Sequence, residues 1–270
     1  MGMYRIGIIV FGLVLLPHTA AAFDNAASVS GKSASSMLLR VVARSTIAPQ
    51  PDTATGVKRA AFARVPASHD VRYIADWIVD SADNLGLPFV IVDKIDAKIF
   101  VFDAAGRIQG AAPALLGSAR GDHTVPGIGD RQYSDMPPET RTTPAGRFVA
   151  ALGTSSARGE DVVWVDYDAA VSLHRVVTTN PKEHRLARLA TATPLDNRIS
   201  YGCINVPARF YENVVRPAFS ATDGIVYVLP EMRPARDVFG SYDVEERARH
   251  QYAVQALPNA ALAGALSVKP

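Results

Sequence analysis

The sequence predicts a mainly β protein with one or two packed helices. Six runs are short, rich in β-branched and aromatic residues, and mostly bounded by Gly, Pro or Asp, as strands are. Two further stretches have helical periodicity. Hydrophobic residues make up 48% of the 270 residues, which is enough for one sizeable core. The strand-like runs are residues 89–94, 97–117, 146–154, 161–168, 171–177 and 224–230.

The first residues, 1–22, are predicted to be a secretory signal peptide. Arg5 precedes an apolar run, residues 6–17, that is too short to span a bilayer, and an Ala-x-Ala exit follows at Ala20–Ala22. No cysteine stands at this exit, so a lipoprotein anchor is not expected. No later apolar run reaches the roughly 18 residues that a membrane helix needs. We therefore expect an exported protein, in the periplasm or cell wall, without a membrane anchor.

Residues 23–67 are predicted to be a flexible lead segment, and residues 68–89 an amphipathic helix. The lead segment is rich in Ala, Ser, Thr and Pro without a sustained period, so order is expected to begin near Ser68. In the helix, apolar residues recur at helical spacing, with Ser68 as N-cap and the Gly-Leu-Pro sequence at 86–88 as its stop.

Residues 90–232 contain most of the predicted strands and form the main domain. The run 97–117 is predicted to be a hairpin that turns at Asp103–Gly106, because glycine supplies the positive φ of a tight turn. A second short helix is expected over residues 207–219, since proline suits the first helical turn. Residues 233–270 are predicted to be a helix-prone tail.

The charge balance gives no indication of a nucleic acid partner or an anionic membrane surface. The chain has 28 Lys and Arg against 26 Asp and Glu, and removal of Arg5 with the signal leaves 28 − 1 = 27 basic residues. The sequence has no His-Glu-x-x-His motif and no second cysteine for a thiolate metal site. No metal or other cofactor is expected.

Cys203 is the single cysteine of the chain, in the stretch RISYGCINVP. An exported protein meets oxidising conditions, so an unpaired thiol is either a small buried hydrophobe or a nucleophile. Residues 200–205 are predicted to form a turn leading toward the second helix, where successive backbone N–H groups can converge on an oxyanion. Gly202 has no Cβ and lets the backbone approach a substrate closely. These neighbours favour a nucleophile.

A cysteine nucleophile normally needs a base, and the chain after the signal offers few histidines. His69 starts the first helix and His250 lies in the tail, so both are poor candidates. His174 lies inside a strand-like run, where a rigid element holds an imidazole in place; the alternative is a core histidine. His184 lies in a polar, helix-prone stretch and is by default solvated. The five histidines are His69, His123, His174, His184 and His250.

Three motifs together resemble the catalytic domain of the L,D-transpeptidase family (YkuD-type). SYGCINV, residues 200–206, resembles the active-site motif Ser/Thr-His-Gly-Cys-aliphatic-Arg/Asn, which a histidine at the end of a strand precedes. RTTPAGRF, residues 141–148, resembles the Thr-Pro-x-Gly-x-Phe start of a strand, and AKIFVFDAAGRI, residues 97–108, resembles the opening hairpin. The resemblance covers roughly residues 90–230.

The resemblance implies an L,D-transpeptidase-like β-sandwich with one or two packed helices, and assigns residues 90–232 as the catalytic domain. Cys203 would attack the carbonyl carbon of the third residue of a peptidoglycan stem peptide and expel D-Ala. Transfer of the thioester to an amine gives an L,D cross-link, whereas hydrolysis would make the enzyme an L,D-carboxypeptidase. The expected partners are therefore peptidoglycan stem peptides, and the protein is expected to act as a monomer.

The resemblance also implies the catalytic roles. Cys203 would be the nucleophile and His174 the general base, later the acid. The backbone N–H groups of Gly202 and Cys203, with that of Tyr201, would form the oxyanion hole.

Three residues are predicted to bind substrate. Ser200 and Asn205 match the polar positions of the family motif. Arg198 is a separate hypothesis, because a guanidinium fork matches the geometry of a substrate carboxylate; the alternative is a solvated arginine.

The chain departs from the family motif at two points. Tyr201 stands where the family usually has histidine. The interval from His174 to Cys203 is also longer than the family's usual one, whereas His184 falls inside the usual range. Because a strand holds a base better than a charged loop does, we favour His174 and interpret residues 178–197 as an insertion that acts as a lid over the acyl site.

Two other function classes are the alternatives. A serine-type hydrolase is disfavoured because the chain has neither a Gly-x-Ser-x-Gly nor a Ser-x-x-Lys motif. The second is a non-catalytic cell-wall-binding module that keeps the fold with an inert Cys203. The presence of both Cys203 and His174 argues against it.

Overall fold

The computed structural model describes residues 56–155 and 159–253. The predicted signal peptide, residues 23–55 of the predicted lead segment and the last 17 residues of the predicted tail, 254–270, lie outside the described residues. Within the described ranges, no helix combines the length and the apolar character that crossing a bilayer requires.

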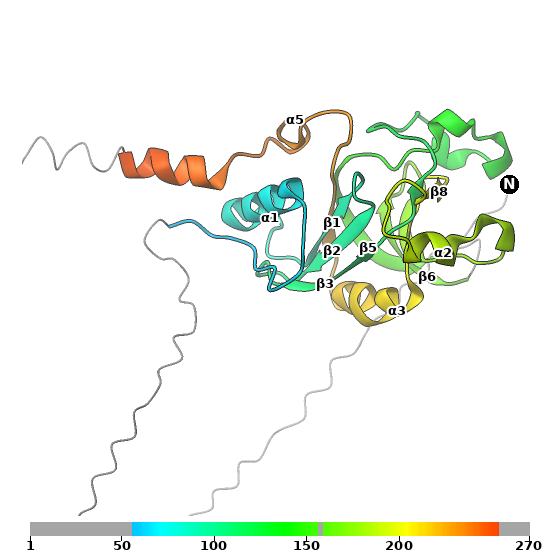
Figure 1. The fold of residues 1–270 in the computed structure, drawn as a ribbon, viewed down its shortest axis with the longest axis horizontal. Helices are drawn as coiled ribbons and strands as arrows, with labels where there is room; N and C mark the ends of the chain where they lie inside the picture. Colours follow the sequence, from blue (N-terminus) through cyan, green and yellow to red (C-terminus); the bar gives the residue numbers. More distant parts are fainter. Residues whose placement is uncertain (1–55, 156–158, 254–270) are drawn as a thin grey trace, which may run out of the picture. The chain divides into compact units, whose positions relative to one another are not determined.

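The strands form one eight-stranded mixed sheet and one two-stranded sheet, so the predicted fold class, mainly β with packed helices, is confirmed (Figure 1). The order across the large sheet is β3-β2-β1-β10-β5-β6-β7-β9, with β1–β10 and β7–β9 parallel. The strands are β1 (Phe89–Asp93), β2 (Lys98–Phe102), β3 (Ile108–Pro113), β4 (Leu116–Gly117), β5 (Gly146–Thr154), β6 (Asp161–Asp166), β7 (Val171–Arg175), β8 (Arg198–Ser200), β9 (Ile204–Val206) and β10 (Gly224–Val228).

The large sheet curls until its two edges are joined. β3 and β9 are the edge strands, and Leu115, two residues after β3, exchanges backbone hydrogen bonds of 2.8 and 2.9 Å with Asn205 of β9. The next residues of the same segment form β4, which pairs in parallel with β8. Residues 115–117, which follow β3, thus pair with both β8 and β9, the two strands that flank Cys203.

Short helices and 3₁₀ turns connect the strands. The predicted hairpin is confirmed: β2 and β3 are antiparallel and Gly106 has φ 78° in the turn. The predicted helix at 207–219 is also present, as α3 (Ala208–Phe210), a π-helical turn η5 (Tyr211–Val215) and α4 (Arg216–Phe219). The remaining elements are α1 (His69–Ser81), η1 (Ile128–Asp130), η2 (Tyr133–Asp135), η3 (Pro138–Thr140), η4 (Pro181–Glu183), α2 (Arg185–Ala190) and α5 (Ala235–Phe239).

Two hydrophobic clusters pack on opposite faces of β1, β2 and β10. Successive residues of a strand point to opposite faces, and along β1 they alternate between the two clusters. Phe89 and Ile91 pack with α1, whereas Val90 and Val92 pack in the cluster that contains η5 and α4. Because both faces are covered by helices, β1 is buried along its whole length.

The boundary between lead segment and ordered domain was placed too late in the sequence, and the first helix was predicted too long. Phe62 is 5% exposed and packs in the α1 cluster, and the backbone of Ala61 pairs with the β2–β3 turn. Ser68 caps α1 as predicted, accepting a hydrogen bond from the Val71 N–H. The helix ends at Ser81, because Ala82 adopts a left-handed conformation that closes the last turn.

The predicted tail packs against α1 in its described part. Residues 244–253 are helical and Val244 is 4% exposed in the α1 cluster. The Tyr242 hydroxyl donates a 2.7 Å hydrogen bond to Asp80 of α1, and Arg247 donates a 2.6 Å hydrogen bond to the same carboxylate. The Asp80 side chain is only 2% exposed, so the tail supplies partners to a buried charge.

Truncation of the chain after Gly240 is expected to lower the free energy of unfolding by about 3–5 kcal/mol, because it removes two of the three hydrogen-bond donors to the buried Asp80 carboxylate, leaving only the Lys58 N–H, and uncovers the α1 cluster. Urea denaturation would measure this. Truncation after Ala253, which keeps the described helical residues, is the matched control and should retain most of the stability. Equal midpoints for the two variants would contradict this account of the tail.

Candidate active site

Cys203 lies directly before β9, beside the strand β7. The predicted turn does not lead straight into the second helix, since β9 intervenes and places residues 204–206 in parallel pairing with β7. The register sets His174 opposite Asn205, and therefore Ser172 opposite Cys203. The Ser172 Oγ lies 3.6 Å from the Cys203 Sγ, in agreement with this register. The thiol is partly buried.

His174 shares a face of the sheet with these residues. It is two residues after Ser172 on β7, so both side chains point to the face on which Cys203 and Asn205 lie. His174 is 3% exposed, and its Nδ1 lies 2.6 Å from the carbonyl oxygen of Arg175. Because a carbonyl oxygen only accepts, Nδ1 carries the proton in this contact and Nε2 is the nitrogen that can act as a base.

The structure separates His184 from this face. His184 follows η4 with φ 48°, is exposed, and lines a surface cleft with Asn180 and Leu186. His69, His123 and His250 are also exposed. A buried strand position therefore distinguishes His174 from the other histidines of the described residues.

The turn before Cys203 is held by side-chain hydroxyls. The Ser200 Oγ donates to the Cys203 carbonyl at 2.6 Å and accepts from the Gly202 N–H at 3.1 Å. The fully buried Thr143 donates its hydroxyl to the Gly202 carbonyl at 2.8 Å. Gly202 has φ 131°, and a Cβ there would lie 2.8 Å from the Thr142 carbonyl oxygen. Glycine is therefore required by both conformation and space.

These contacts reduce the number of backbone N–H groups that are available for the predicted oxyanion hole. The N–H of Gly202 is already donated to Ser200, whereas within residues 56–155 and 159–253 no acceptor is found for the N–H of Tyr201 or of Cys203. Ser200 is 3% exposed and both of its side-chain hydrogen bonds stay within the turn, so its contact with substrate stays a prediction.

Asn205 connects Cys203 to the segment between β7 and β8. Its Nδ2 donates to the Cys203 carbonyl at 3.2 Å, and its Oδ1 accepts from Arg185 at 2.8 Å. Arg185 also forms an ion pair with Glu183, and its side chain is 11% exposed. The predicted insertion therefore contacts the site through Arg185, and its action as a lid stays a prediction.

Tyr201 stands on the solvent side of the turn, in an aromatic and cationic cluster. Its ring lies 5.0 Å from that of Tyr133, centroid to centroid, and the Arg141 guanidinium lies 4.3 Å from its centroid. Arg141 is itself fixed by two hydrogen bonds to the Met136 carbonyl. Tyr201 and Tyr133 are 36% and 57% exposed, so both rings are accessible to solvent, and Tyr201 is two residues before Cys203.

A buried lysine supports the threonine that holds the turn. The Lys94 side chain is fully buried, and its ammonium group donates to the Gly121 carbonyl at 2.6 Å, to Asp122 at 2.8 Å and to the Thr143 carbonyl at 3.0 Å. Burial lowers the pKa of Lys94 and outweighs the opposing effect of Asp122. For Asp122, burial acts to raise the pKa, but hydrogen bonds from Lys94 and two backbone N–H groups outweigh it and hold the pKa below its usual value.

The prediction that Arg198 binds a substrate carboxylate does not agree with the structure. Its guanidinium forms a two-pronged ion pair with Glu231, at 3.2 and 2.6 Å, and donates to the Lys94 carbonyl at 2.8 Å. The Glu231 side chain is 1% exposed. Arg198 therefore neutralises a buried carboxylate of its own chain, which is the geometry expected of a structural arginine.

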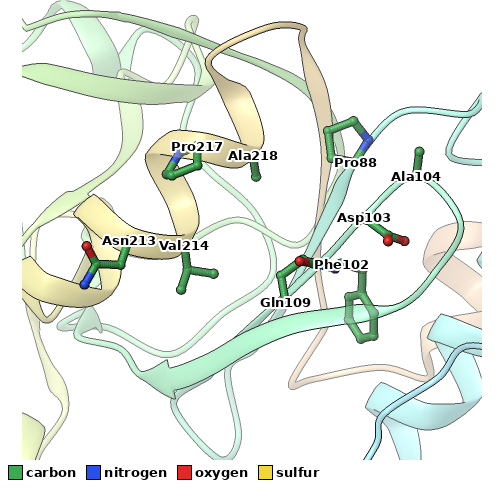
Figure 2. Close-up of a pocket in the computed structure, with 9 residues that line it drawn as sticks. All are labelled: Pro88, Phe102, Asp103, Ala104, Gln109, Asn213, Val214, Pro217 and Ala218. Carbon is green, nitrogen blue, oxygen red and sulfur yellow. The ribbon is translucent and has the colours of Figure 1, made fainter.

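A separate cleft of about 350 Å³ lies between the β2–β3 hairpin and the helix formed by α3, η5 and α4 (Figure 2). No predicted site residue lines it, so it is distinct from the candidate active site. The lining residues are Pro88, Phe102, Asp103, Ala104, Gln109, Asn213, Val214, Pro217 and Ala218.

Several site residues were missed from the sequence. Thr143 belongs to the stretch 141–148, which predicts only the start of a strand. Alternation along the strand-like run could have placed Ser172 on the face of His174. Lys94 and Arg185 gave no signal, because a charged residue at a strand end or in a polar loop is normally solvated.

Comparisons with known proteins gave matches only among solved structures. No family model and no curated protein matches the chain. The helical cell shape determining protein Pgp2 (K307A mutant) from Campylobacter jejuni is similar at 12% identity over 60% of this chain and 51% of that chain, with a TM-score of 0.38. LD transpeptidase LdtMt1 in complex with imipenem is similar at 16% identity over 53% and 58%, with a TM-score of 0.30.

A third similar structure is the catalytic domain of the E. faecium L,D-transpeptidase, with 16% identity over 52% of this chain and 95% of that chain and a TM-score of 0.28. The chain spans about half the length of the first two solved structures. At these identities and TM-scores the likenesses do not assign the chain to a family.

Replacement of Lys94 by methionine is expected to lower the free energy of unfolding by about 3–5 kcal/mol, because it leaves the buried Asp122 and Glu231 carboxylates with less compensating charge. Urea denaturation at neutral pH would measure the change. Lys98→Met, at an exposed position of β2, is the matched control and should change stability by less than about 0.5 kcal/mol. A Lys94→Met protein as stable as the control would show that the network is not needed.

Proposed function

We propose that this protein is a peptidoglycan L,D-transpeptidase that uses Cys203 as nucleophile and His174 as base. The observation that carries the proposal is the β7–β9 register, which puts the only thiol of the chain and a buried imidazole on one face of two adjacent strands. The motif SYGCINV supports the substrate class, since it resembles the active site of that family.

In the first half-reaction, Cys203 would attack the carbonyl carbon between the third stem-peptide residue and D-Ala. His174 takes the thiol proton at Nε2, the sulfur–carbon bond forms, and the carbonyl oxygen becomes an oxyanion. Collapse breaks the carbon–nitrogen bond, and the D-Ala amine leaves with the proton from His174. The product is a thioester on Cys203.

In the second half-reaction, an amine of a neighbouring stem peptide would attack the thioester carbon. His174 accepts the amine proton, the carbon–nitrogen bond forms, and the Cys203 thiolate leaves and is reprotonated. Attack by water in place of the amine would give L,D-carboxypeptidase activity. Defined stem peptides with and without an amine acceptor, followed by product identification, distinguish these two outcomes.

The oxyanion would be stabilised by the backbone N–H groups of Cys203 and Tyr201. The Gly202 N–H could join them only by exchanging its bond to Ser200. Asn205 would act as a positioning residue, because its Nδ2 donates to the Cys203 carbonyl and so fixes the backbone beside the thiol. Arg185 would act through Asn205, since it donates to the Asn205 Oδ1.

Replacement of Cys203 by serine is expected to reduce stem-peptide turnover by at least about 10⁴-fold with the melting temperature preserved, because a hydroxyl is far harder to deprotonate than a thiol. Incubation of the unmodified chain with a carbapenem should add one inhibitor mass, detected by mass spectrometry, and Cys203→Ala should abolish the adduct. Turnover by the serine variant would eliminate the thioester mechanism. If the folded, unmodified chain reacts with neither the stem peptide nor the carbapenem, a wall-binding module would be favoured.

Replacement of His174 by alanine is expected to slow acylation by about 10²–10⁴-fold, because the base is lost. His184→Ala is the matched control and should acylate at close to the original rate, since His184 is exposed and outside the β7–β9 face. Stopped-flow fluorescence with a β-lactam would follow acylation, after circular dichroism has shown that both variants are folded. A slow His184 variant beside a fast His174 variant would reverse the assignment.

A further inference from the structure

Ser172 is a buried hydroxyl beside the reacting sulfur that no step above uses. It lies on β7, is 5% exposed, and its Oγ is 3.6 Å from the Cys203 Sγ. Its backbone is held on one side by Trp164 of β6, and the β7–β9 register sets it opposite Cys203 on the other. The hydroxyl is therefore positioned by two neighbouring strands rather than by a loop.

The second contact of the sulfur is with a backbone carbonyl, which cannot donate a hydrogen bond to a thiolate. The Cys203 Sγ lies 3.7 Å from the Ala170 carbonyl oxygen, which can only accept a hydrogen bond. This contact suits the neutral thiol, which donates its S–H. A hydroxyl differs from a carbonyl because it both donates and accepts, so Ser172 can accept from the thiol and then donate to the thiolate.

We propose that Ser172 donates a hydrogen bond to the Cys203 thiolate and is a further catalytic residue of this site. The hydroxyl stabilises the sulfur whenever it carries negative charge, which occurs before attack on the donor peptide and again when the thiolate leaves the thioester. A thioester sulfur is a weaker acceptor, so the bond favours both charged states over the acyl intermediate. The hydrogen bond itself does not depend on the proposed function; only its role in catalysis rests on that function.

Other titratable or charged groups also lie on the elements packed around the thiol. His174 lies on the same strand as Ser172, Arg185 of α2 reaches the Cys203 carbonyl through Asn205, and Arg141 lies over the Tyr201 ring. A test of Ser172 must leave these groups in place. Substitution of the hydroxyl alone does so.

The test is the pH dependence of alkylation of the full chain by iodoacetamide, in which the sulfur–carbon bond forms and iodide leaves. Ser172→Ala is expected to move the midpoint of the rate profile upward by about one pH unit, since the thiolate loses a hydrogen bond to a charged atom. At a pH well below the midpoint the rate should fall about threefold, because about tenfold less thiolate is present but a more basic thiolate is about threefold more nucleophilic; for the second reason the plateau at high pH should not fall.

Two variants control this experiment. Ser172→Thr keeps the hydroxyl in a residue that strands favour and should restore the original midpoint. Ser155→Ala removes a buried serine hydroxyl that follows β5, outside the candidate active site, and should not move the midpoint.

An unchanged midpoint in Ser172→Ala, or equal midpoints in the alanine and threonine variants, would overturn the proposal. A lower plateau with an unchanged midpoint would indicate a merely structural role and would overturn it as well. Alkylation needs no peptidoglycan substrate, so these failures are distinguishable from failure of the proposed function, which would leave the midpoint shift intact while stem peptides go unprocessed.

Discussion

The buried ammonium group of Lys94 is the interaction on which the candidate site depends. A charge without access to water is costly unless its donors are satisfied, and all three hydrogen bonds of Lys94 go to groups far away in the sequence. They join the end of β1 to the segment at 121–122 and to Thr143. Glu231, after β10, accepts from Arg198 of β8 in the same network, so five distant segments are held together.

This constraint reaches Cys203 through two short links. Lys94 fixes the carbonyl of Thr143, whose hydroxyl fixes the carbonyl of Gly202, and Arg198 holds β8 on the other side of the same turn. A nucleophile must be held within a fraction of an ångström of its productive position. Around the proposed nucleophile, the two hydrogen bonds of the turn through Ser200 are joined by one from Thr143, whose carbonyl the buried Lys94 holds.

The sequence predicted the parts of this arrangement that local pattern determines. Alternation and β-branched residues located the long strands, and placed His174 on one of them. β8 and β9 were missed, because strands of three residues have no period and pair only with distant segments. Arg198 was misinterpreted for a related reason: its partner Glu231 is 33 residues away, and a guanidinium fork fits a substrate carboxylate as well as a buried one.

The exposed residues of the site are held by different interactions from its buried residues. Ser172, His174 and Asn205 are all at most 5% exposed and bonded into strands, which leaves them little freedom to adapt to different substrates. Tyr201 and Tyr133 are exposed, and their positions depend on stacking and on Arg141 rather than on the sheet. Tyr201 also stands where the resembled motif usually has histidine, so this departure from the motif falls on the exposed part of the site and leaves the buried residues of β7 and β9 unaffected.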